Sequence, residues 1–233
     1  MNGILYIVAT PIGNLEDITL RALRVLKEVE AIACEDTRVT SRLLSHYSIS
    51  KPLLSLHHHS GEAQFGKILA LLAEGKSVAY ASDAGTPGIS DPGNKLVEQA
   101  LLGNFTVVPI PGASALATLI SVSGIDMQTF TFLGFPPHKK GRETFFKKVA
   151  ALEIPVVYYD SPHRVIKNLK LLQALQTSEL NSEPELSSGK RIIIGRELTK
   201  LFEEIVRGDV AEIESYFATH PEKMKGEFSV IVY

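Results

Sequence analysis

The most distinctive candidate for a chemical role is the stretch SDAGTPGISDPG, which runs from Ser82 to Gly93. It contains three glycines, two prolines and two aspartates, but no lysine or arginine. P-loops end in Gly-Lys-Ser/Thr and dinucleotide-binding turns read Gly-x-Gly-x-x-Gly, so the stretch matches neither pattern. We therefore do not expect it to bind phosphate.

An acidic loop rich in glycine suits a different kind of ligand. Gly85 and Gly88 would allow the backbone to approach a ligand closely, and Pro87 and Pro92 would stiffen the loop. The carboxylate of Asp83 and nearby backbone carbonyls favour hydroxyls, amines or a positive centre. S-adenosylmethionine (AdoMet) offers ribose hydroxyls, an amino group and a sulfonium, so the loop predicts an AdoMet site. The alternative is a stiff connector between a strand and a helix.

The elements that must position this loop are apolar runs alternating with helical patterns. Such alternation predicts an α/β fold whose strands form parallel sheets covered on both faces. We expect an N-terminal α/β domain over 1–117 and a C-terminal α/β domain over 118–233. The expected strands are 4–9, 31–34, 77–82, 105–110, 130–135, 155–159, 191–194 and 227–233. The expected helices are 20–29, 39–47, 63–73, 95–102 and 165–175, with a polar loop over 177–189.

Polar residues follow several of these strands. In open parallel sheets, ligands bind beyond the carboxyl ends of the strands. Predicted strands run into the segments ATPIGNLED, EDTR, PGASAL, YYDSPHR and IGRELTK, and another runs into SDAGTPGISDPG. Their convergence is a stronger indication of a site than any one motif.

Composition limits the alternatives. The 233 residues carry a net charge of −2, so any RNA-binding surface must be a local patch. No apolar run reaches the roughly 18 residues that a transmembrane helix needs, and no basic leader precedes the first strand, so we expect a cytoplasmic protein. The single cysteine, Cys34, excludes an internal disulfide and a multi-cysteine metal site. Side chains of the consecutive His57, His58 and His59 alternate in direction, so we expect no metal site.

Five stretches together resemble the bacterial 16S ribosomal RNA (cytidine-2′-O)-methyltransferase family, a branch of the tetrapyrrole-methylase superfamily of AdoMet enzymes. They are LYIVATPIGNLEDITLRALRVLKEVEAIACEDTR, SDAGTPGISDPG, PIPGASAL, YYDSPHR and RELTKLFEE. The resemblance implies two α/β/α domains with AdoMet in the cleft between them, and a homodimer. The implied substrate is a decoding-centre cytidine of 16S rRNA in the small ribosomal subunit. Members often carry a further C-terminal helical extension, whereas this sequence stops at GEFSVIVY, so we expect a difference in ribosome binding.

The resemblance also implies roles for individual residues. The expected catalytic group is Glu35, Asp36, Arg38 and Lys200, although the first three could instead form a surface ion pair. Arg38 could also hold RNA phosphate. The expected cofactor-binding residues are Pro11, Gly13, Asp83, Ala84, Gly85, Pro87, Gly88, Ile89, Ser114 and Ala115.

Methyl transfer to a ribose hydroxyl raises the question of a general base, because the hydroxyl is a weak nucleophile. Glu35, Asp36 and the histidines at 57–59 are candidates, and the sequence does not choose among them. Lys200 and Arg196 could polarise the hydroxyl or bind phosphate.

The segment HKKGRETFFKK, over 138–148, contains the densest group of cations. We expect Lys139, Lys140 and Arg142, with Lys147 and Lys148, to bind RNA, although an ordinary solvated helix start would look the same. Two other functions stay open: a methyltransferase of the same superfamily acting on a small molecule, and a non-catalytic RNA-binding module.

Overall fold

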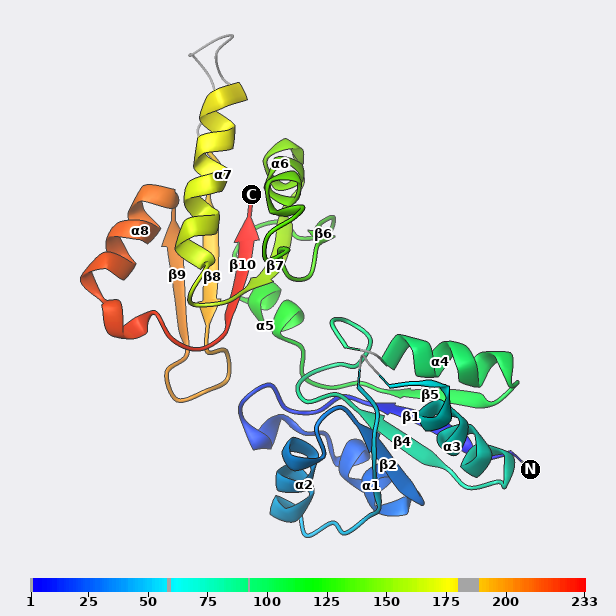
Figure 1. The fold of residues 1–233 in the computed structure, drawn as a ribbon. Helices are drawn as coiled ribbons and strands as arrows, with labels where there is room; N and C mark the ends of the chain where they lie inside the picture. Colours follow the sequence, from blue (N-terminus) through cyan, green and yellow to red (C-terminus); the bar gives the residue numbers. More distant parts are fainter. Residues whose placement is uncertain (1, 58–59, 92, 180–188) are drawn as a thin grey trace. The chain divides into compact units, whose positions relative to one another are not determined.

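The computed structural model describes residues 2–57, 60–91, 93–179 and 189–233. It divides into two compact units, Met1–Ser114 and Ala115–Tyr233, which are considered in turn (Figure 1). Within the described residues no helix is both long and apolar enough to cross a membrane.

The first unit alternates strands and helices as expected. Its elements are β1 (Ile4–Val8), the 3-10 helix η1 (Leu15–Asp17), α1 (Leu20–Glu28), β2 (Ala31–Cys34), α2 (Thr37–His46), β3 (Leu53–Ser55), α3 (Glu62–Ala73), β4 (Val78–Ala81), α4 (Gly93–Leu102) and β5 (Thr106–Ile110). The five strands pair in the order β3-β2-β4-β1-β5, and every pair is parallel, which confirms the predicted parallel sheet here.

Helices cover both faces of this sheet because its strands are apolar on both sides. Leu5 of β1 packs in one core with Ile68 of α3 and Leu96 of α4. Val8 of β1 packs in the other core with Val25 of α1. Because both faces of these strands are buried, the polar residues lie in the loops that follow the strands, and these loops form the candidate site.

The second unit contains a mixed sheet. Its elements are α5 (Ala115–Ser121), β6 (Thr131–Phe132), α6 (Arg142–Ala151), β7 (Val156–Asp160), α7 (Val165–Glu179), β8 (Ile192–Arg196), β9 (Glu204–Gly208), α8 (Val210–Thr219), the 3-10 helix η2 (Pro221–Lys223) and β10 (Phe228–Val232). The strand order is β6-β7-β10-β8-β9. Only β6 and β7 are parallel; β10 is antiparallel to both neighbours, and β8 is antiparallel to β9.

The expectation of a parallel sheet is therefore wrong for the second unit. The connection between β8 and β9 spans only 197–203. A parallel pair needs a crossover of about a dozen residues or more, so this connection can only form a hairpin. The alternation of strand and helix patterns in the sequence did not distinguish a parallel sheet from a mixed one.

Other boundaries also differ from the expected ones. The strand expected over 130–135 is limited to Thr131–Phe132, because Gly134 adopts φ +66° and turns the chain before Pro136. Helix α7 continues to Glu179, and most of the expected loop over 177–189 lies outside the described residues. The sequence patterns did not indicate β3, β9 or α8.

Candidate active site

Three loops at the carboxyl ends of the first sheet are joined by hydrogen bonds. Thr10 and Gly85 exchange two backbone hydrogen bonds, each 3.0 Å from N to O, so the loops after β1 and β4 form an antiparallel bridge. The Thr86 hydroxyl donates to the Ala113 carbonyl at 3.0 Å and ties in the loop after β5. Gly85 has φ +78°, and an added Cβ would lie 3.2 Å from Ile12, so this close approach favours glycine.

Asp91 organises the acidic loop from within. One of its carboxylate oxygens accepts the backbone N–H of Gly88 at 2.5 Å, and the other accepts the N–H of Gly93 at 2.8 Å. The Tyr80 hydroxyl donates to the same oxygen as Gly93, at 3.1 Å. Both carboxylate oxygens of Asp91 therefore hold the loop in shape. Of the two aspartates in the loop, Asp83 is the one that can contact a ligand.

Asp83 lies exposed at the end of β4 and connects it to the end of β2. Its Oδ1 atom accepts the backbone N–H of Asp36 at 3.0 Å. The expected cofactor anchor and the expected catalytic segment EDTR are therefore in direct contact.

A cavity of about 310 Å³ is bounded by Asp83 and the loop after β1. Four of the expected cofactor residues line it, namely Pro11, Gly13, Asp83 and Ala84. The other lining residues are Thr10, Ile12, Leu15, Val39, Thr40, Arg42, Leu43 and Ser82. A mostly apolar wall with few charged groups is typical of small-molecule sites.

The remaining expected cofactor residues do not line this cavity. Gly85 and Pro87 are buried, while Gly88 and Ile89 are half-buried. Ser114 ends the first unit and Ala115 begins the second.

The sequence did not indicate the contribution of α2 to the cavity. Val39, Arg42 and Leu43 lie three and four residues apart, and this spacing places them on one face of the helix. Helix α2 starts within the EDTR segment, so the spacing of these three residues could have indicated from the sequence that the helix lines the cavity.

Among the described residues of the first unit, Glu35 has the strongest indication of acid–base chemistry. It directly follows β2 and is half-buried. Burial raises the pKa of Glu35 from 4.5 to about 7, and the negative charges of Asp83 and Asp91 add to the effect. A carboxyl group with a pKa near neutrality can take up and release a proton at physiological pH.

Asp36 and Arg38 form the ion pair that the sequence left open. Asp36 caps α2 by accepting the backbone N–H of Arg38 at 2.8 Å. The guanidinium of Arg38 binds both carboxylate oxygens, with Nη2–Oδ2 at 2.5 Å and Nε–Oδ1 at 3.0 Å. These hydrogen bonds lower the pKa of Asp36 to about 2, so this carboxylate is a poor proton acceptor at neutral pH.

Lys200 belongs to the second unit, in the loop between β8 and β9. Its Nζ donates to Glu197 at 2.8 Å and to Glu227 at 3.1 Å. Burial favours the neutral amine, but these two carboxylates outweigh it and raise the pKa of Lys200. Lys200 is therefore a cation at neutral pH and cannot serve as a base.

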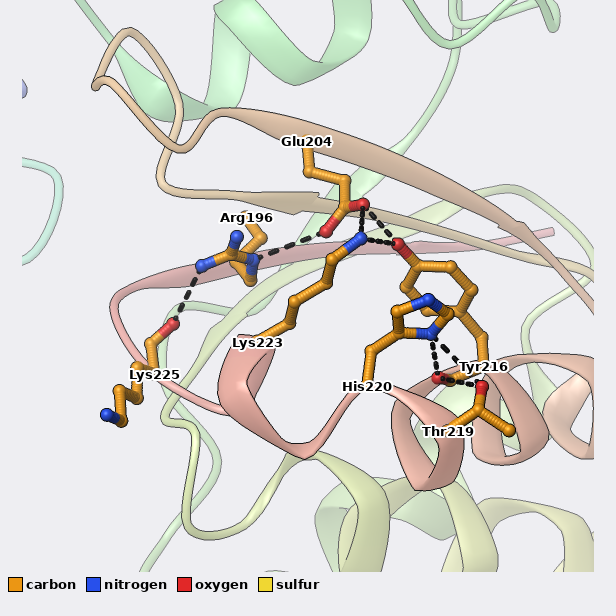
Figure 2. Close-up of polar contacts among 7 residues, drawn as sticks. All are labelled: Arg196, Glu204, Tyr216, Thr219, His220, Lys223 and Lys225. Atoms are coloured by element: carbon orange, nitrogen blue, oxygen red, sulfur yellow. Dashed lines mark hydrogen bonds and ion pairs between the residues drawn. The ribbon is translucent and has the colours of Figure 1, made fainter.

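Arg196 lies nearly buried at the end of β8, within a polar network (Figure 2). Its Nε atom is 3.5 Å from the carboxylate of Glu204, and its Nη1 donates to the Lys225 carbonyl at 3.3 Å. The same carboxylate accepts hydrogen bonds from Lys223 and from the Tyr216 hydroxyl. These contacts join β8, β9, α8 and η2. The role of Arg196 in this network is therefore structural.

The expected RNA-binding cations differ in their surroundings. Lys139 and Lys140 are exposed before α6. Arg142 is half-buried, and its Nη2 donates to the Lys167 carbonyl at 3.2 Å, which ties α6 to α7. Lys147 and Lys148 are both exposed, and Lys147 pairs with Glu143 at 2.8 Å.

The histidine run is only partly described. The backbone N–H of His57 donates to the Ser60 hydroxyl at 2.9 Å, while His58 and His59 lie outside the described residues. Among the residues that are described, no group of three His, Cys, Asp or Glu side chains is placed to hold a metal ion.

Comparison with known proteins adds a full-length relationship. The family model for Tetrapyrrole (Corrin/Porphyrin) Methylases matches residues 4–214. The ribosomal RNA small subunit methyltransferase I of Borrelia garinii is 45% identical over 231 residues, covering 98% of this chain and 97% of that protein. The protein of the same name from Pasteurella multocida is 42% identical, covering 100% of this chain and 79% of the relative. The Thermotoga maritima protein is 42% identical, covering 99% and 98%.

Solved structures share the architecture at low sequence identity. Cobalt precorrin-4 methyltransferase, CbiF, aligns with a TM-score of 0.68 at 17% identity, covering 98% of this chain and 94% of that one. Uroporphyrin III C-methyltransferase from Thermus thermophilus aligns with a TM-score of 0.63 at 18% identity, covering 99% and 97%. These structures share the fold, while the family model and the full-length relatives show that the chain belongs to the tetrapyrrole methylase family and, within it, to the ribosomal RNA small subunit methyltransferase I family.

Proposed function

We propose that the chain is an AdoMet-dependent enzyme that methylates the ribose 2′-oxygen of a decoding-centre cytidine in 16S rRNA of the small ribosomal subunit. The observation that carries the proposal is 42–45% identity along nearly the whole chain to small subunit rRNA methyltransferases from three different bacteria. A small-molecule substrate has weaker support, because the solved tetrapyrrole enzymes are only 17–18% identical. In the proposal the enzyme acts in the cytoplasm, and it forms the homodimer that the resemblance implies.

The residues at the carboxyl ends of the first sheet fit AdoMet chemically. Asp83 offers a carboxylate for an amino group or ribose hydroxyls, and Arg42 offers a cation for a carboxylate. Ile12 and Leu43 supply apolar wall for the uncharged parts of the molecule. When bound, AdoMet supplies the electrophilic methyl group.

Glu35 is the proposed proton acceptor. The 2′-hydroxyl must lose its proton as its oxygen forms the new bond to carbon, and a positioned base accelerates that step by about 10²–10⁴-fold. Glu35, with a pKa of about 7, is partly ionised at neutral pH and can bind the proton. Asp36, with a pKa of about 2, instead keeps α2 and Arg38 in place.

The cations have binding roles in this proposal. Lys139 and Lys140 are exposed and suit RNA phosphates. Lys200 stays protonated, so it can bind a phosphate or polarise a hydroxyl but cannot remove a proton.

The test is methyl transfer from AdoMet labelled in its methyl group. Small subunits from a strain that lacks the endogenous enzyme are incubated with the purified protein, and label in 16S rRNA is counted. Label in the rRNA supports the proposal. Label only in a tetrapyrrole, supplied in a parallel reaction, would establish the small-molecule alternative, and RNA binding without transfer would establish the non-catalytic one.

A further inference from the structure

Phe135 is an exposed aromatic residue held on a fixed turn of the second unit. The residue is 54% exposed, and it directly follows Gly134, where the chain turns with φ +66°. The carbonyl of Gly134 accepts the backbone N–H of Tyr159 at 2.9 Å, and the N–H of Leu133 donates to Val157 at 3.0 Å. The backbone that carries Phe135 is therefore bonded to β7.

The ring of Phe135 rests on other aromatic rings. Its centroid lies 5.3 Å from that of Tyr159, with a tilt of 57°. Tyr159 in turn lies 5.0 Å from Phe132 in an edge-to-face arrangement. Such contacts support one side of the Phe135 ring while more than half of its surface stays accessible.

Arg164 fixes the other end of the turn. Its Nη1 donates to the Pro136 carbonyl at 3.1 Å, and its Nε donates to the Ser161 hydroxyl at 3.1 Å. Asp160, 3.9 Å from Arg164, is held in place by Asn168, whose amide donates to it at 2.6 Å. The side chain of Arg164 thus holds the turn, and the backbone is fixed by hydrogen bonds both before and after Phe135.

Two exposed cations follow Phe135 closely in the chain. Lys139 lies four residues further on, so its Cα can be at most about 14 Å from that of Phe135. Lys140 comes next and is also exposed. Phe202 provides a contrast in the same unit: it is 66% exposed but is followed by Glu203 and Glu204. Lys200 lies two residues before Phe202, but it is already paired with Glu197 and Glu227. The charge in the neighbouring sequence is therefore positive at Phe135 and negative at Phe202, which favours a polyanion at Phe135.

We propose that Phe135 is a stacking platform for an unpaired nucleobase of the RNA substrate, with Lys139 and Lys140 binding neighbouring phosphates. Proteins that bind single-stranded RNA combine exposed rings with a positively charged surface in this way. The inference rests on the proposed function for the identity of the RNA, but it concerns binding and needs no chemistry.

The test separates ring stacking from apolar contact and from charge. Binding of a fluorescein-labelled, cytidine-containing single-stranded RNA oligonucleotide is measured by anisotropy for wild type, Phe135→Leu and Phe135→Trp, with Phe202→Leu as the matched control. We expect Phe135→Leu to weaken binding by about 10-fold, Phe135→Trp to bind at least as tightly as wild type, and Phe202→Leu to change little. The salt dependence should stay unchanged in Phe135→Leu and decrease in Lys139→Ala.

Several outcomes would overturn the platform: wild-type affinity in Phe135→Leu, an equal loss in Phe202→Leu, or no measurable binding by the wild type. Thermal melting checks the fold, and the Trp variant tests the ring without relying on a loss. Steady-state methylation of small subunits adds an independent readout, in which Phe135→Leu should raise KM and leave kcat nearly unchanged. Ring-dependent binding without any methyl transfer would refute the proposed function but support the platform. Methyl transfer without ring-dependent binding would support the proposed function but refute the platform.

Discussion

The backbone N–H of Asp36 donates to the carboxylate of Asp83 at 3.0 Å. This contact joins the ends of β2 and β4, so the residue proposed to hold the cofactor also fixes the segment that carries Glu35. Substitutions at Asp83 must therefore separate the loss of charge from the loss of the turn.

Asp83→Asn should weaken AdoMet binding by at least about 10-fold while retaining the fold, because a charge-assisted hydrogen bond contributes about 1.5–3 kcal/mol. The Asn side chain keeps an oxygen that can accept from Asp36, so the link between the strands survives. Isothermal titration calorimetry measures the affinity, with Asp126→Asn, in the second unit, as the control. Equal affinities for Asp83→Asn and wild type would remove Asp83 from the cofactor site.

Glu35 should give the reaction a rising pH profile. Since the pKa of Glu35 is about 7, kcat/KM for methylation should increase as pH rises through 7. Glu35→Gln should lower kcat by about 10²–10⁴-fold and abolish that rising limb. Asp36→Asn is the control, because the pKa of Asp36 is about 2 and its charge does not change in this range. A rising limb that persists in Glu35→Gln would assign the proton transfer to another group.

The same shift has a consequence for stability. The folded pKa of Glu35 lies above its ordinary value of 4.5, so the folded protein binds the proton more tightly than the unfolded chain does. The stabilisation by Glu35 is complete below pH 4.5 and is lost as pH rises toward 7. In urea titrations, the free energy of unfolding of wild type relative to Glu35→Gln should fall across that interval. A difference that is flat with pH would contradict the raised pKa.

How much of this site could be predicted depended on whether the decisive contacts were local. The apolar runs of β1, β2, β4 and β5 are local patterns, so these four strands of the first sheet were predictable, whereas the short edge strand β3 was not. The pairing of β10 between β7 and β8 is not local, and the parallel sheet expected there was wrong.

The separation of Glu35 from Asp36 also depended on the fold. Adjacent carboxylates look alike in sequence, and only burial near Asp83 and Asp91 raises one pKa while Arg38 lowers the other. Likewise, Arg142 looks like another exposed cation in HKKGRETFFKK until its contact with α7 is seen.

The network in Figure 2 should stabilise the second unit. Burial opposes ionisation of Glu204, but hydrogen bonds from Lys223 and Tyr216 outweigh it and lower the pKa of Glu204. Glu204→Gln should therefore reduce the free energy of unfolding at pH 7 by about 1–3 kcal/mol. The difference from wild type should shrink as pH falls below 4.5, because the stabilisation is lost as Glu204 becomes protonated.

Glu28→Gln is the matched control for that prediction. Glu28 pairs with Arg24 at 2.9 Å, but both side chains are about 60% exposed, so its removal should change stability by less than about 0.5 kcal/mol. Equal effects of the two substitutions would show that the Glu204 network contributes no more than a surface pair.

The basic segment should divide into RNA-binding and structural cations. The double variant Lys139→Ala, Lys140→Ala should reduce the slope of log affinity against log salt by about 0.7 for each lost contact to single-stranded RNA, with no change in thermal stability. Arg142→Ala should instead lower the melting temperature, because it removes the bond to the Lys167 carbonyl. An unchanged slope in the double variant would identify Lys139 and Lys140 as an ordinary solvated surface.

The most direct test of the account is the chemical identity of the methylated nucleoside. Small subunits methylated in vitro with labelled AdoMet are extracted, and the rRNA is digested to nucleosides and analysed by mass spectrometry. The account predicts label in 2′-O-methylcytidine, with the modified linkage resistant to alkaline hydrolysis because its 2′-oxygen is blocked. Label on a cytosine ring, on another nucleoside, or absent from 16S rRNA while Asp83-dependent AdoMet binding is intact would contradict it.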